Sequence, residues 1–505
     1  MTETTIASGT TEAGNWSPRA LASGGALAAI IALGDFLFWA NEPGISFFIF
    51  FFGLSLAIVA LHPQRWRAGQ TVALFVVALL AAAPIVEALS PFAFVIALGG
   101  VGLLAIGISG QLPQFEDWLG TAVRFAVLAP LRLADDGLGV LIGAGRQKVG
   151  GHLLRGVVAW IVPLVFALVF VMLFAAANPV VEYGLRAIRL DTLLELVNPG
   201  RLIFWGVLAF IAWPFLAPKL LRWTGMAEMH GPALPRAESL LFGSTAIRNS
   251  LIVFNAMFAV QTVLDLMFLW GGVRLPDGMS HAEYAHRGAY PLIVTAILAG
   301  LFVLAAMRRD GAGRQSPLIR GLVYLWIAQN VWLVVSSVLR LKLYVEIYTL
   351  SEMRIAAFIW MGLVAVGLVL IVVKIVMDRT NKWLVVSNLA VLTATLWAVS
   401  WVDLQGFIAQ YNVRHAYEVT GEGVPLDFYH TADLGAAAVP ALDEFLSTAR
   451  HASDSTLKEF RLLREELASR AVVDEGWRNW SWREDRLRQY LGEHPFAPES
   501  GKAID

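Results

Sequence analysis

The sequence predicts an all-α fold: a polytopic bundle of about eleven transmembrane helices, followed by a small helical domain outside the membrane. Two features of the composition support this fold class. Of all residues, 57% are hydrophobic and only 15% are charged, whereas a soluble domain has roughly 25% charged residues. The third observation is a series of apolar runs of about 20 residues, each long enough as a helix to cross a hydrocarbon core of about 30 Å.

The composition and the motifs exclude several function classes. The formal net charge of -1 gives no electrostatic footprint for nucleic acid. With 0 cysteines, the chain has no disulfide, thiol nucleophile or cysteine metal site. No phosphate-binding loop, Gly-rich dinucleotide turn, nucleophile elbow or calcium-loop pattern occurs. We therefore expect no cofactor, no metal and no nucleic-acid partner, and the expected partner is the lipid bilayer.

The chain begins with a polar stretch at 1–18 that is typical of a disordered tail, here cytoplasmic. The transmembrane domain is expected over 19–403. Its apolar runs are 19–40, 44–61, 70–89, 91–109, 153–177, 200–221, 243–271, 288–307, 319–338, 355–377 and 383–402. Within them, Pro84, Pro163, Pro214 and Pro218 are expected to kink their helices, and Gly99-Gly100-x-Gly102 indicates close helix packing.

The bias of Lys and Arg between the loops predicts the orientation. With a cytoplasmic N-terminus, the inner segments carry roughly nineteen basic residues and the outer loops roughly eight. An odd number of spans then places the C-terminal region on the outer side. The stretch 112–139 is apolar but short and contains Arg124, Pro130 and Arg132, so we place it in the inner interface. If it spans the membrane instead, every later assignment inverts.

Residues 404–505 are expected to form a C-terminal extracytoplasmic helical domain, because charge density rises after the last apolar run. The stretch 432–451 predicts a helix interrupted at Pro440, and Thr456 with Glu459 has the spacing of a capping box. A second helix has one apolar face at helical spacing, made of Leu457, Phe460, Leu463 and Leu467. A third is expected over 485–491. The nearby Trp477, Trp480 and Trp482 suit docking onto the bilayer or the membrane domain, and core packing equally well.

Three stretches carry a family resemblance: HAEYAHRGAYPLIVTAILAGLFVLA at 281–305, VLRLKLYVEIYTLSEMRIAAFIWM at 338–361, and the Tyr411-Asn412-Val413 step after the last run. They resemble segments of an uncharacterised family of polytopic membrane proteins, domain of unknown function 4173, a relative of domain of unknown function 4153. The resemblance covers about residues 20–490. It implies a multi-pass protein of the bacterial inner membrane, and it implies no activity.

One position departs from the pattern of this family. The second segment of the family often reads Tyr-Gly-Leu-Thr-x-x-Arg, and here Tyr348, Leu350 and Arg354 match, while Thr349 replaces the Gly and Ser351 the Thr. Because Thr tolerates positive φ poorly, the exchange argues against a special backbone conformation at residue 349.

Acidic side chains in or near the predicted spans are the first candidates for a functional site, because a charge in lipid is costly and must face protein or water. Asp35, Glu87, Asp265 and Asp403 all fall toward the outer half of the membrane in this topology. Each of these acidic residues, taken singly, is explained by a position at a helix end near the membrane surface. Taken together, the four indicate a polar cavity that opens outward. Asp265 lies deepest, and Gln261 shares its helix face one turn earlier.

A second polar stripe lies in the run 319–338 and its continuation. Gln329, Ser336 and Arg340 are seven and four residues apart, so they share one helix face. A pair between Arg340 and Asp265 or Glu87 would cancel buried charge. Our hypothesis is an outward-facing site for substrate or ion binding, built from Asp265, Gln261, Gln329 and Arg340, with Asp35 and Glu87 as further candidates.

The outer loop before residue 288 is the third candidate and contains His281, Glu283, His286 and Arg287. Its His-x-Glu-x-x-His order differs from the His-Glu-x-x-His spacing of a zinc protease. On a helix, His281 and His286 would point about 140° apart, which does not suit one metal ion. We expect an interfacial turn whose His and Arg side chains bond carbonyls or headgroups.

Three function classes remain open after this reading. The first is transport or small-molecule handling through the outward polar cavity, which the intramembrane polar groups favour. The second is an envelope scaffold or sensor component that binds a protein partner through residues 405–505. The third is an integral-membrane transferase, for which His281 and His286 are the candidate general bases. The absence of recognised catalytic motifs favours a protein that is not an enzyme.

Overall fold

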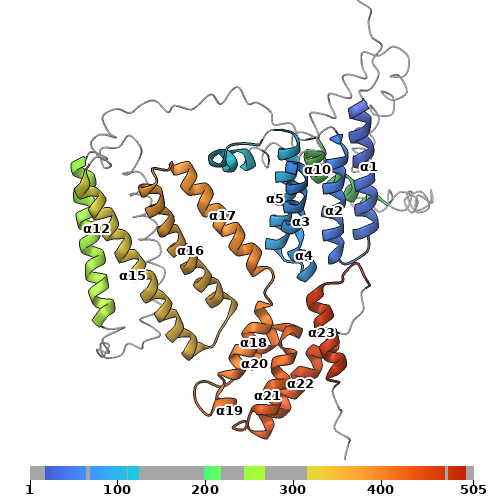
Figure 1. Ribbon diagram of the computed structural model, residues 1–505. Helices are drawn as coiled ribbons and strands as arrows, with labels where there is room; N and C mark the ends of the chain where they lie inside the picture. Colours follow the sequence, from blue (N-terminus) through green and yellow to red (C-terminus); the bar gives the residue numbers. More distant parts are fainter. Residues whose placement is uncertain are drawn as a thin grey trace, which may run out of the picture. The chain divides into compact units, whose positions relative to one another are not determined.

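The computed structural model describes residues 18–63, 69–110, 112–123 and 125, 198–217, 244–267, 316–471 and 476–495 (Figure 1). Across these ranges every regular element is a helix, and one isolated β-bridge joins Ala416 to Val424. The described chain divides into two compact units, the first holding the N-terminal helices and residues 476–479, the second holding most of the remainder. The all-α prediction is confirmed.

Seven of the described helical segments are long and apolar enough to cross a membrane: Gly69–Glu87, Pro91–Ile108, Pro199–Leu216, Ser244–Asp265, Pro317–Tyr348, Glu352–Val376 and Asn381–Val399. Two shorter apolar helices, Ala22–Phe38 and Ile45–Ala60, coincide with the first two predicted runs. The polytopic architecture is therefore confirmed. The runs 153–177 and 288–307, the tail before residue 18 and most of 112–139 lie outside the described residues, and the number of spans stays a prediction.

Unit 1 is a bundle of membrane helices around one apolar core. Its helices are α1 (Pro18–Phe38), α2 (Ile45–Ala60), α3 (Gly69–Ala82), α4 (Pro84–Glu87), α5 (Pro91–Ile108) and α10 (Pro199–Leu216). The centre of the core is formed by fully buried side chains of α2 and α5, among them Leu54, Ile58, Val101 and Leu104.

Local sequence explains where these helices end and how closely they pack. Pro84 cannot donate a backbone hydrogen bond, and α3 accordingly ends at Ala82, with Pro84 starting the short α4. Ser90 caps α5, its Oγ accepting from the Ala93 amide at 3.1 Å. A Cβ on Gly100 would lie 2.5 Å from the Ala81 Cβ on α3. The predicted close packing is found at Gly100, whereas a Cβ on Gly99 would meet nothing within 4 Å and one on Gly102 would lie 3.7 Å from the Phe215 ring.

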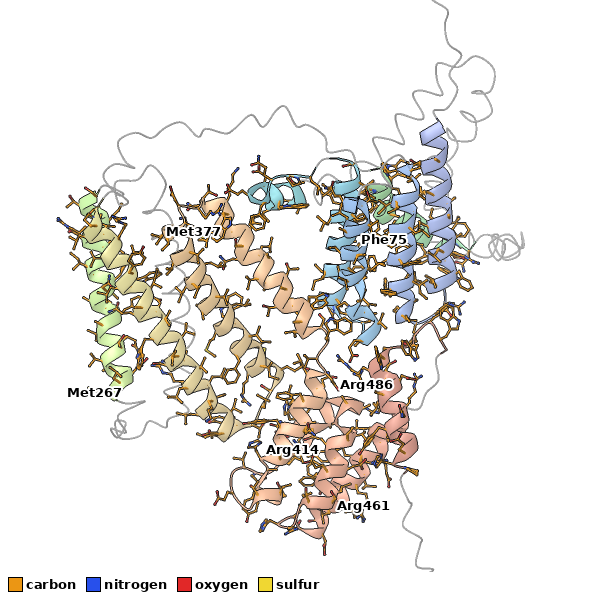
Figure 2. All side chains as sticks on the ribbon, viewed as in Figure 1. Phe75, Met267, Met377, Arg414, Arg461 and Arg486 are labelled. Carbon is orange, nitrogen blue, oxygen red and sulfur yellow. The ribbon has the colours of Figure 1, made fainter. Side chains whose placement is uncertain are left out.

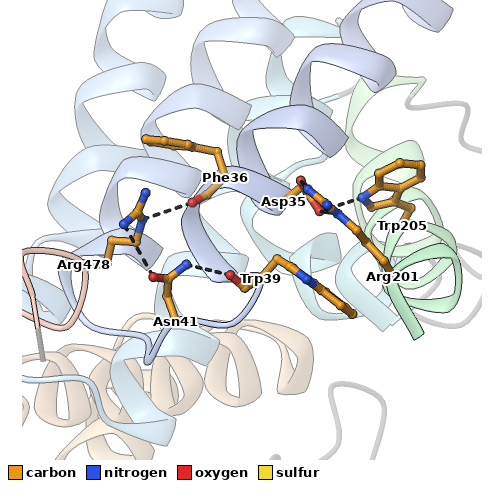
Figure 3. A network of polar contacts seen from close by, with 7 residues as sticks. All are labelled: Asp35, Phe36, Trp39, Asn41, Arg201, Trp205 and Arg478. Atoms are coloured by element: carbon orange, nitrogen blue, oxygen red, sulfur yellow. Dashed lines mark hydrogen bonds and ion pairs between the residues drawn. The ribbon is translucent and has the colours of Figure 1, made fainter. Parts of the chain in front are cut away.

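A segment from near the other end of the chain, residues 476–479, belongs to unit 1 and covers the turn between α1 and α2 (Figure 3). The Arg478 Nε donates to the Phe36 carbonyl at 3.0 Å, and its guanidinium lies over the Phe36 ring, 4.5 Å from the centroid. The Ser46 amide donates to the Arg478 carbonyl at 3.3 Å. Gly44 permits this approach, because a Cβ there would lie 2.2 Å from the Asn479 carbonyl oxygen.

Substituting Gly44→Ala is expected to displace residues 476–479, because the new methyl group collides with backbone that has no room to rotate away. The Ser46 amide then loses its acceptor, and its hydrogen exchange should speed up at least about fivefold, the value of one net hydrogen bond. Hydrogen exchange with mass spectrometry measures it. Gly206→Ala on α10 is the control, since its Cβ meets nothing within 4 Å; equal protection in both variants would contradict the proposed fit.

The membrane part of unit 2 contains α12 (Ser244–Asp265), α15 (Pro317–Tyr348), α16 (Glu352–Val376), α17 (Asn381–Val399) and the 3-10 helix η2 (Phe115–Asp117). Neighbours pack in the order α12, α15, α16, α17 (Figure 1). A core of Leu251, Phe258, Val323 and Trp326 joins α12 to α15. By contrast, α16 is strongly apolar and yet almost unburied, so its surface suits contact with lipid.

The turn between α16 and α17 is held by a cap at each helix end. Asp378 adopts a left-handed conformation, with φ 54°, and the Arg379 amide donates to the Lys374 carbonyl at 3.0 Å, as in a Schellman motif. Thr380 then caps α17 by accepting from the Trp383 amide at 3.0 Å. The two caps reverse the chain within a few residues, which makes α16 and α17 antiparallel neighbours.

The C-terminal helices form a cluster in unit 2 around their own apolar core. They are α18 (Leu404–Arg414), α19 (Tyr417–Thr420), α20 (Phe428–Asp433), η4 (Gly435–Ala438), α21 (Val439–Thr448), α22 (Asp454–Ala471) and α23 (Trp482–Glu493). Phe460, Leu463 and Leu467 are buried and Leu457 packs against them, which confirms the predicted apolar face. The core also takes in Val345 and Leu350, so the end of α15 is built into it. A separate extramembrane domain beginning at residue 404 stays a prediction.

Two local predictions in this cluster need correction. The helix expected over 432–451 is divided into the end of α20, η4 and α21, and Pro440 lies in the first turn of α21, where its missing N–H is harmless. The capping box expected at Thr456 is wrong by one turn, because Ser453 Oγ accepts from the Thr456 amide at 3.2 Å and α22 begins at Asp454. Ser453, three residues before Thr456, is the N-cap residue instead.

Charged side chains cross-link the cluster away from the membrane helices. The Arg464 Nε donates to Asp443 at 2.9 Å, and Arg464 is buried. The Tyr490 hydroxyl donates to the same carboxylate at 3.1 Å. Burial and the neighbouring Asp443 raise the pKa of Tyr490 to about 12. On the exposed side, the bond to Glu444 raises the pKa of Arg414. Figure 2 shows the side chains of this region, with Arg414 and Arg461 labelled.

Candidate functional site

Helices α12 and α15 run parallel and meet along a polar stripe. The Asn255 Nδ2 donates to the Leu322 carbonyl at 3.1 Å, and the Gln329 Nε2 donates to the Asn255 carbonyl at 3.1 Å. Between these contacts, the rings of Phe258 and Trp326 lie 6.5 Å apart. From Leu322, the partner of Asn255, to Arg340, the partner of Asp265, the contacts on α15 advance as those on α12 advance. This register carries the stripe to the C-terminal end of α12, where Asp265 is the last residue.

Asp265 and Arg340 form a buried ion pair at that end. We call these two residues, together with Gln261, the Asp265 site. Asp265 is 0% exposed and Arg340 is 4% exposed. The Asp265 Oδ1 accepts from the Arg340 guanidinium and from Gln261 Nε2, the latter at 2.9 Å. Each charge is costly away from water, and each neutralises the other here. Three of the four residues in the sequence hypothesis are thus brought together.

Gln329, the fourth residue, lies elsewhere on the same stripe. It precedes Arg340 by three helical turns, about 16 Å along α15, and it bonds Asn255 rather than the ion pair. Ser336 lies between them in the sequence and is fully buried. The polar stripe is therefore continuous along α15, and its charges are concentrated at one end.

Several buried acceptor atoms in this stripe have no hydrogen-bond partner within the described part of the chain: Asp265 Oδ2, Asn255 Oδ1 and Gln329 Oε1. The Ser336 Oγ is in the same position. Buried polar groups without partners are uncommon and cost about 1–3 kcal/mol each. Acceptor oxygens of this kind can receive a cation, a proton or the donor group of a small molecule.

The other acidic candidates lie outside the Asp265 site. Asp35 and Glu87 belong to unit 1, and Asp403 caps a helix of the C-terminal cluster. Asp35 at the end of α1 pairs with Arg201 on α10, whose Nε lies 2.7 Å away, and accepts from Trp205 Nε1 at 2.8 Å (Figure 3). Glu87 is the buried last residue of α4. Asp403 is the N-cap of α18, accepting from the Gly406 amide at 3.2 Å, and lies 3.8 Å from Arg483. The outer-loop residues His281, Glu283, His286 and Arg287 lie outside the described residues.

The second and third family segments, at 338–361 and 411–413, meet at Leu350. The Asn412 Oδ1 accepts from the Leu350 amide at 2.7 Å, and its Nδ2 donates to the Leu350 carbonyl at 2.9 Å. The His430 Nε2 lies 3.1 Å from the same carbonyl. We call this arrangement the Leu350 clamp. It fixes the turn between α15 and α16 to α18 and α20, and no spacing in the sequence predicts a contact across 62 residues.

Thr349, next to the clamp, adopts the backbone conformation that the sequence argued against. Its φ is 65° and its ψ is 177°, a region that glycine alone enters readily. The Arg354 guanidinium, stacked 4.8 Å from the centroid of the Tyr344 ring, donates to the Tyr348 and Thr349 carbonyls. The hydrogen bonds to Leu350 and to the Tyr348 and Thr349 carbonyls hold the backbone on both sides of this residue, which explains how Thr is kept in this conformation.

Thr349→Gly is expected to stabilise the protein. Removing the Cβ relieves strain of about 1–3 kcal/mol, and the extra freedom of Gly in the unfolded chain offsets about 0.5–1 kcal/mol of it. Thermal unfolding of the full chain in detergent should show a net gain of about 1 kcal/mol. Ser351→Gly is the matched control, because its φ of -139° is ordinary and its side chain makes no cap bond. A destabilised Thr349→Gly variant would show that the turn is unstrained.

The Asp265 site should behave as a coupled pair in a double-mutant cycle. Asp265→Asn removes the carboxylate that pairs with the buried Arg340, and the expected loss of stability is about 3–5 kcal/mol. Adding Arg340→Gln removes the second buried charge and should recover most of that loss. Thermal unfolding of both single variants and of the double variant measures the coupling. Additive losses would mean that the two charges are solvated independently.

Comparison with known proteins identifies a family without an assigned activity. A family model described as a domain of unknown function (DUF4153) matches residues 26–445. It covers all the described membrane helices except the first residues of α1, together with the Asp265 site and the Leu350 clamp. The resemblance predicted from the sequence is confirmed through this relative of domain of unknown function 4173. No curated protein and no solved structure shows a significant match.

Proposed function

The chain belongs to this family of unknown function, and on that premise we propose that it binds a small cationic or hydrogen-bond-donating solute at the Asp265 site and passes it across the membrane. The observation that supports this proposal is a buried ion pair inside membrane helices whose carboxylate keeps one oxygen without a partner among the described residues. Ionisable groups within membrane spans commonly mark solute or proton pathways.

The geometry supplies a way for binding to be transmitted. Arg340 and Gln261 both occupy Oδ1 of Asp265, and Oδ2 remains for the solute. A proton or cation on this carboxylate cancels the charge that holds Arg340. Since the pair joins the C-terminal end of α12 to α15, weakening it frees the two helices to shift. Binding and helix movement would then be linked through one carboxylate.

The predicted topology indicates the side of the membrane at which the Asp265 site lies. Arg340 precedes Val345, which packs in the C-terminal cluster, by about 8 Å along α15. The Asp265 site therefore lies at the membrane face that carries this cluster. With a cytoplasmic N-terminus and an odd number of spans, this face is the outer side of a bacterial inner membrane.

The test uses the variant that keeps stability but lacks both charges, Asp265→Asn with Arg340→Gln. Wild-type protein in detergent should show a rise in melting temperature with one of NaCl, KCl or NH4Cl over choline chloride at equal ionic strength, because a bound ion stabilises the folded state. The double variant should lose this rise, and it should fail to restore growth to a host whose own copy is deleted. Asp35→Asn with Arg201→Gln removes a matched, more exposed pair and should behave as wild type. An unchanged ion response or full growth in the Asp265 and Arg340 double variant would refute the proposal.

A second function is favoured by the Leu350 clamp. Because Asn412 and His430 hold the turn that ends α15, force on the C-terminal cluster reaches the helix carrying Arg340. A scaffold or sensor component that binds an envelope protein through residues 405–505 would use this linkage. The cluster exposes Tyr429, which is 80% accessible. Tyr429→Ser should weaken such a partner's binding and leave the ion response intact, the reverse of the result expected for the Asp265 variants.

A further inference from the structure

An open cavity of about 630 Å³ lies in unit 2 at the ends of α15, α16 and α17 that are far from the C-terminal cluster. Arg320 comes from the first turn of α15, Lys374 from the last turn of α16, and Lys382 from the first turn of α17. Arg379 comes from the turn between α16 and α17. The acidic residues in the lining are Glu116 of η2 and Asp378. Residues distant in sequence thus place four cations around one hollow.

The charges of this cavity are only partly balanced. Lys382 pairs with Asp117 at 2.9 Å, and both side chains are more than half exposed, so the pair is weak. Lys374 is buried and donates to Asn381 Oδ1, which fixes its ammonium at the wall. Arg320 and Arg379 are exposed and form no ion pair within the described ranges. The cavity therefore offers two guanidinium groups beside a fixed ammonium group.

We propose that this cavity binds a phosphate-bearing anion. Guanidinium groups bind phosphate oxygens in a bidentate manner, and a lysine adds a point charge. Basic pockets between membrane helices at the cytoplasmic face are a known setting for phosphate headgroups, and the predicted topology places these helix ends at that face.

The rim of the cavity favours the headgroup of an anionic lipid over free phosphate as the source. Large apolar side chains next to the basic residues are exposed: Leu318 at 56%, Val376 at 70% and Met377 at 56%. Met377 marks this end of α16 in Figure 2. A phosphate in the cavity would leave acyl chains lying along α16, whose surface is apolar and little buried.

The experiment reconstitutes the full chain in nanodiscs and counts the lipids that stay bound in native mass spectrometry. The probes are phosphatidylglycerol, phosphatidylcholine and, separately, inorganic phosphate. Arg320→Gln with Arg379→Gln should lower phosphatidylglycerol retention about twenty-five-fold, because each basic side chain near a membrane surface contributes about fivefold. Arg450→Gln with Lys458→Gln removes the same charge from exposed positions of the C-terminal cluster and should leave retention unchanged.

A variant that is expected to retain more lipid shows whether misfolding explains the loss in the arginine variant. Glu116→Gln removes a lining carboxylate and should raise phosphatidylglycerol retention about fivefold, a gain that an unfolded protein does not show. Preference for phosphatidylglycerol over inorganic phosphate assigns a lipid headgroup, and binding of inorganic phosphate alone assigns a soluble source. Equal retention of phosphatidylglycerol and phosphatidylcholine, or a loss that the Arg450 and Lys458 variant shares, would overturn the proposal.

Discussion

Hydrocarbon provides no hydrogen bonds, so every polar group inside this protein depends on another part of the chain, and the pairing of α12 with α15 shows how that requirement is met. Asn255 and Gln329 bond backbone carbonyls, and Asp265 is neutralised by Arg340. These bonds fix one register between the two helices, which apolar contacts alone would not specify. The same stripe leaves acceptor atoms without partners among the described residues. A purely structural seam would gain by replacing these with apolar groups, which is why we place the functional proposal here.

The Leu350 clamp extends this order beyond the membrane helices. A side-chain amide that bonds both the N–H and the C=O of one residue copies the pairing of a β-strand. It permits the strained conformation of Thr349, and it ends α15 at a defined point. Val345 and Leu350 also belong to the apolar core of the C-terminal cluster, so the C-terminal end of α15 packs together with this cluster.

Sequence patterns predicted the features that depend on residues close together in the chain. Apolar run length predicted the described membrane helices, and the period of Leu457, Phe460, Leu463 and Leu467 predicted the buried face of α22. Helical spacing brought Gln261 to Asp265, since both lie on one helix. The patterns could not show that Gln329 faces Asn255 instead of the ion pair, because that depends on the register between helices. They also missed Asn412 as the partner of Leu350, and they misjudged Thr349, because neighbours distant in sequence impose its conformation.

The attachment of residues 476–479 to the turn between α1 and α2 has a consequence for the order of synthesis. Arg478 follows Phe36, whose carbonyl it binds, by 442 residues. The first helix pair therefore enters the membrane long before the segment that covers its turn has left the ribosome. During all that time the Phe36 carbonyl and the Ser46 amide must be satisfied by water or by an assisting protein. A chain must be translated past Asn479 before unit 1 is complete, so a product terminated before residue 476 leaves the turn between α1 and α2 uncovered.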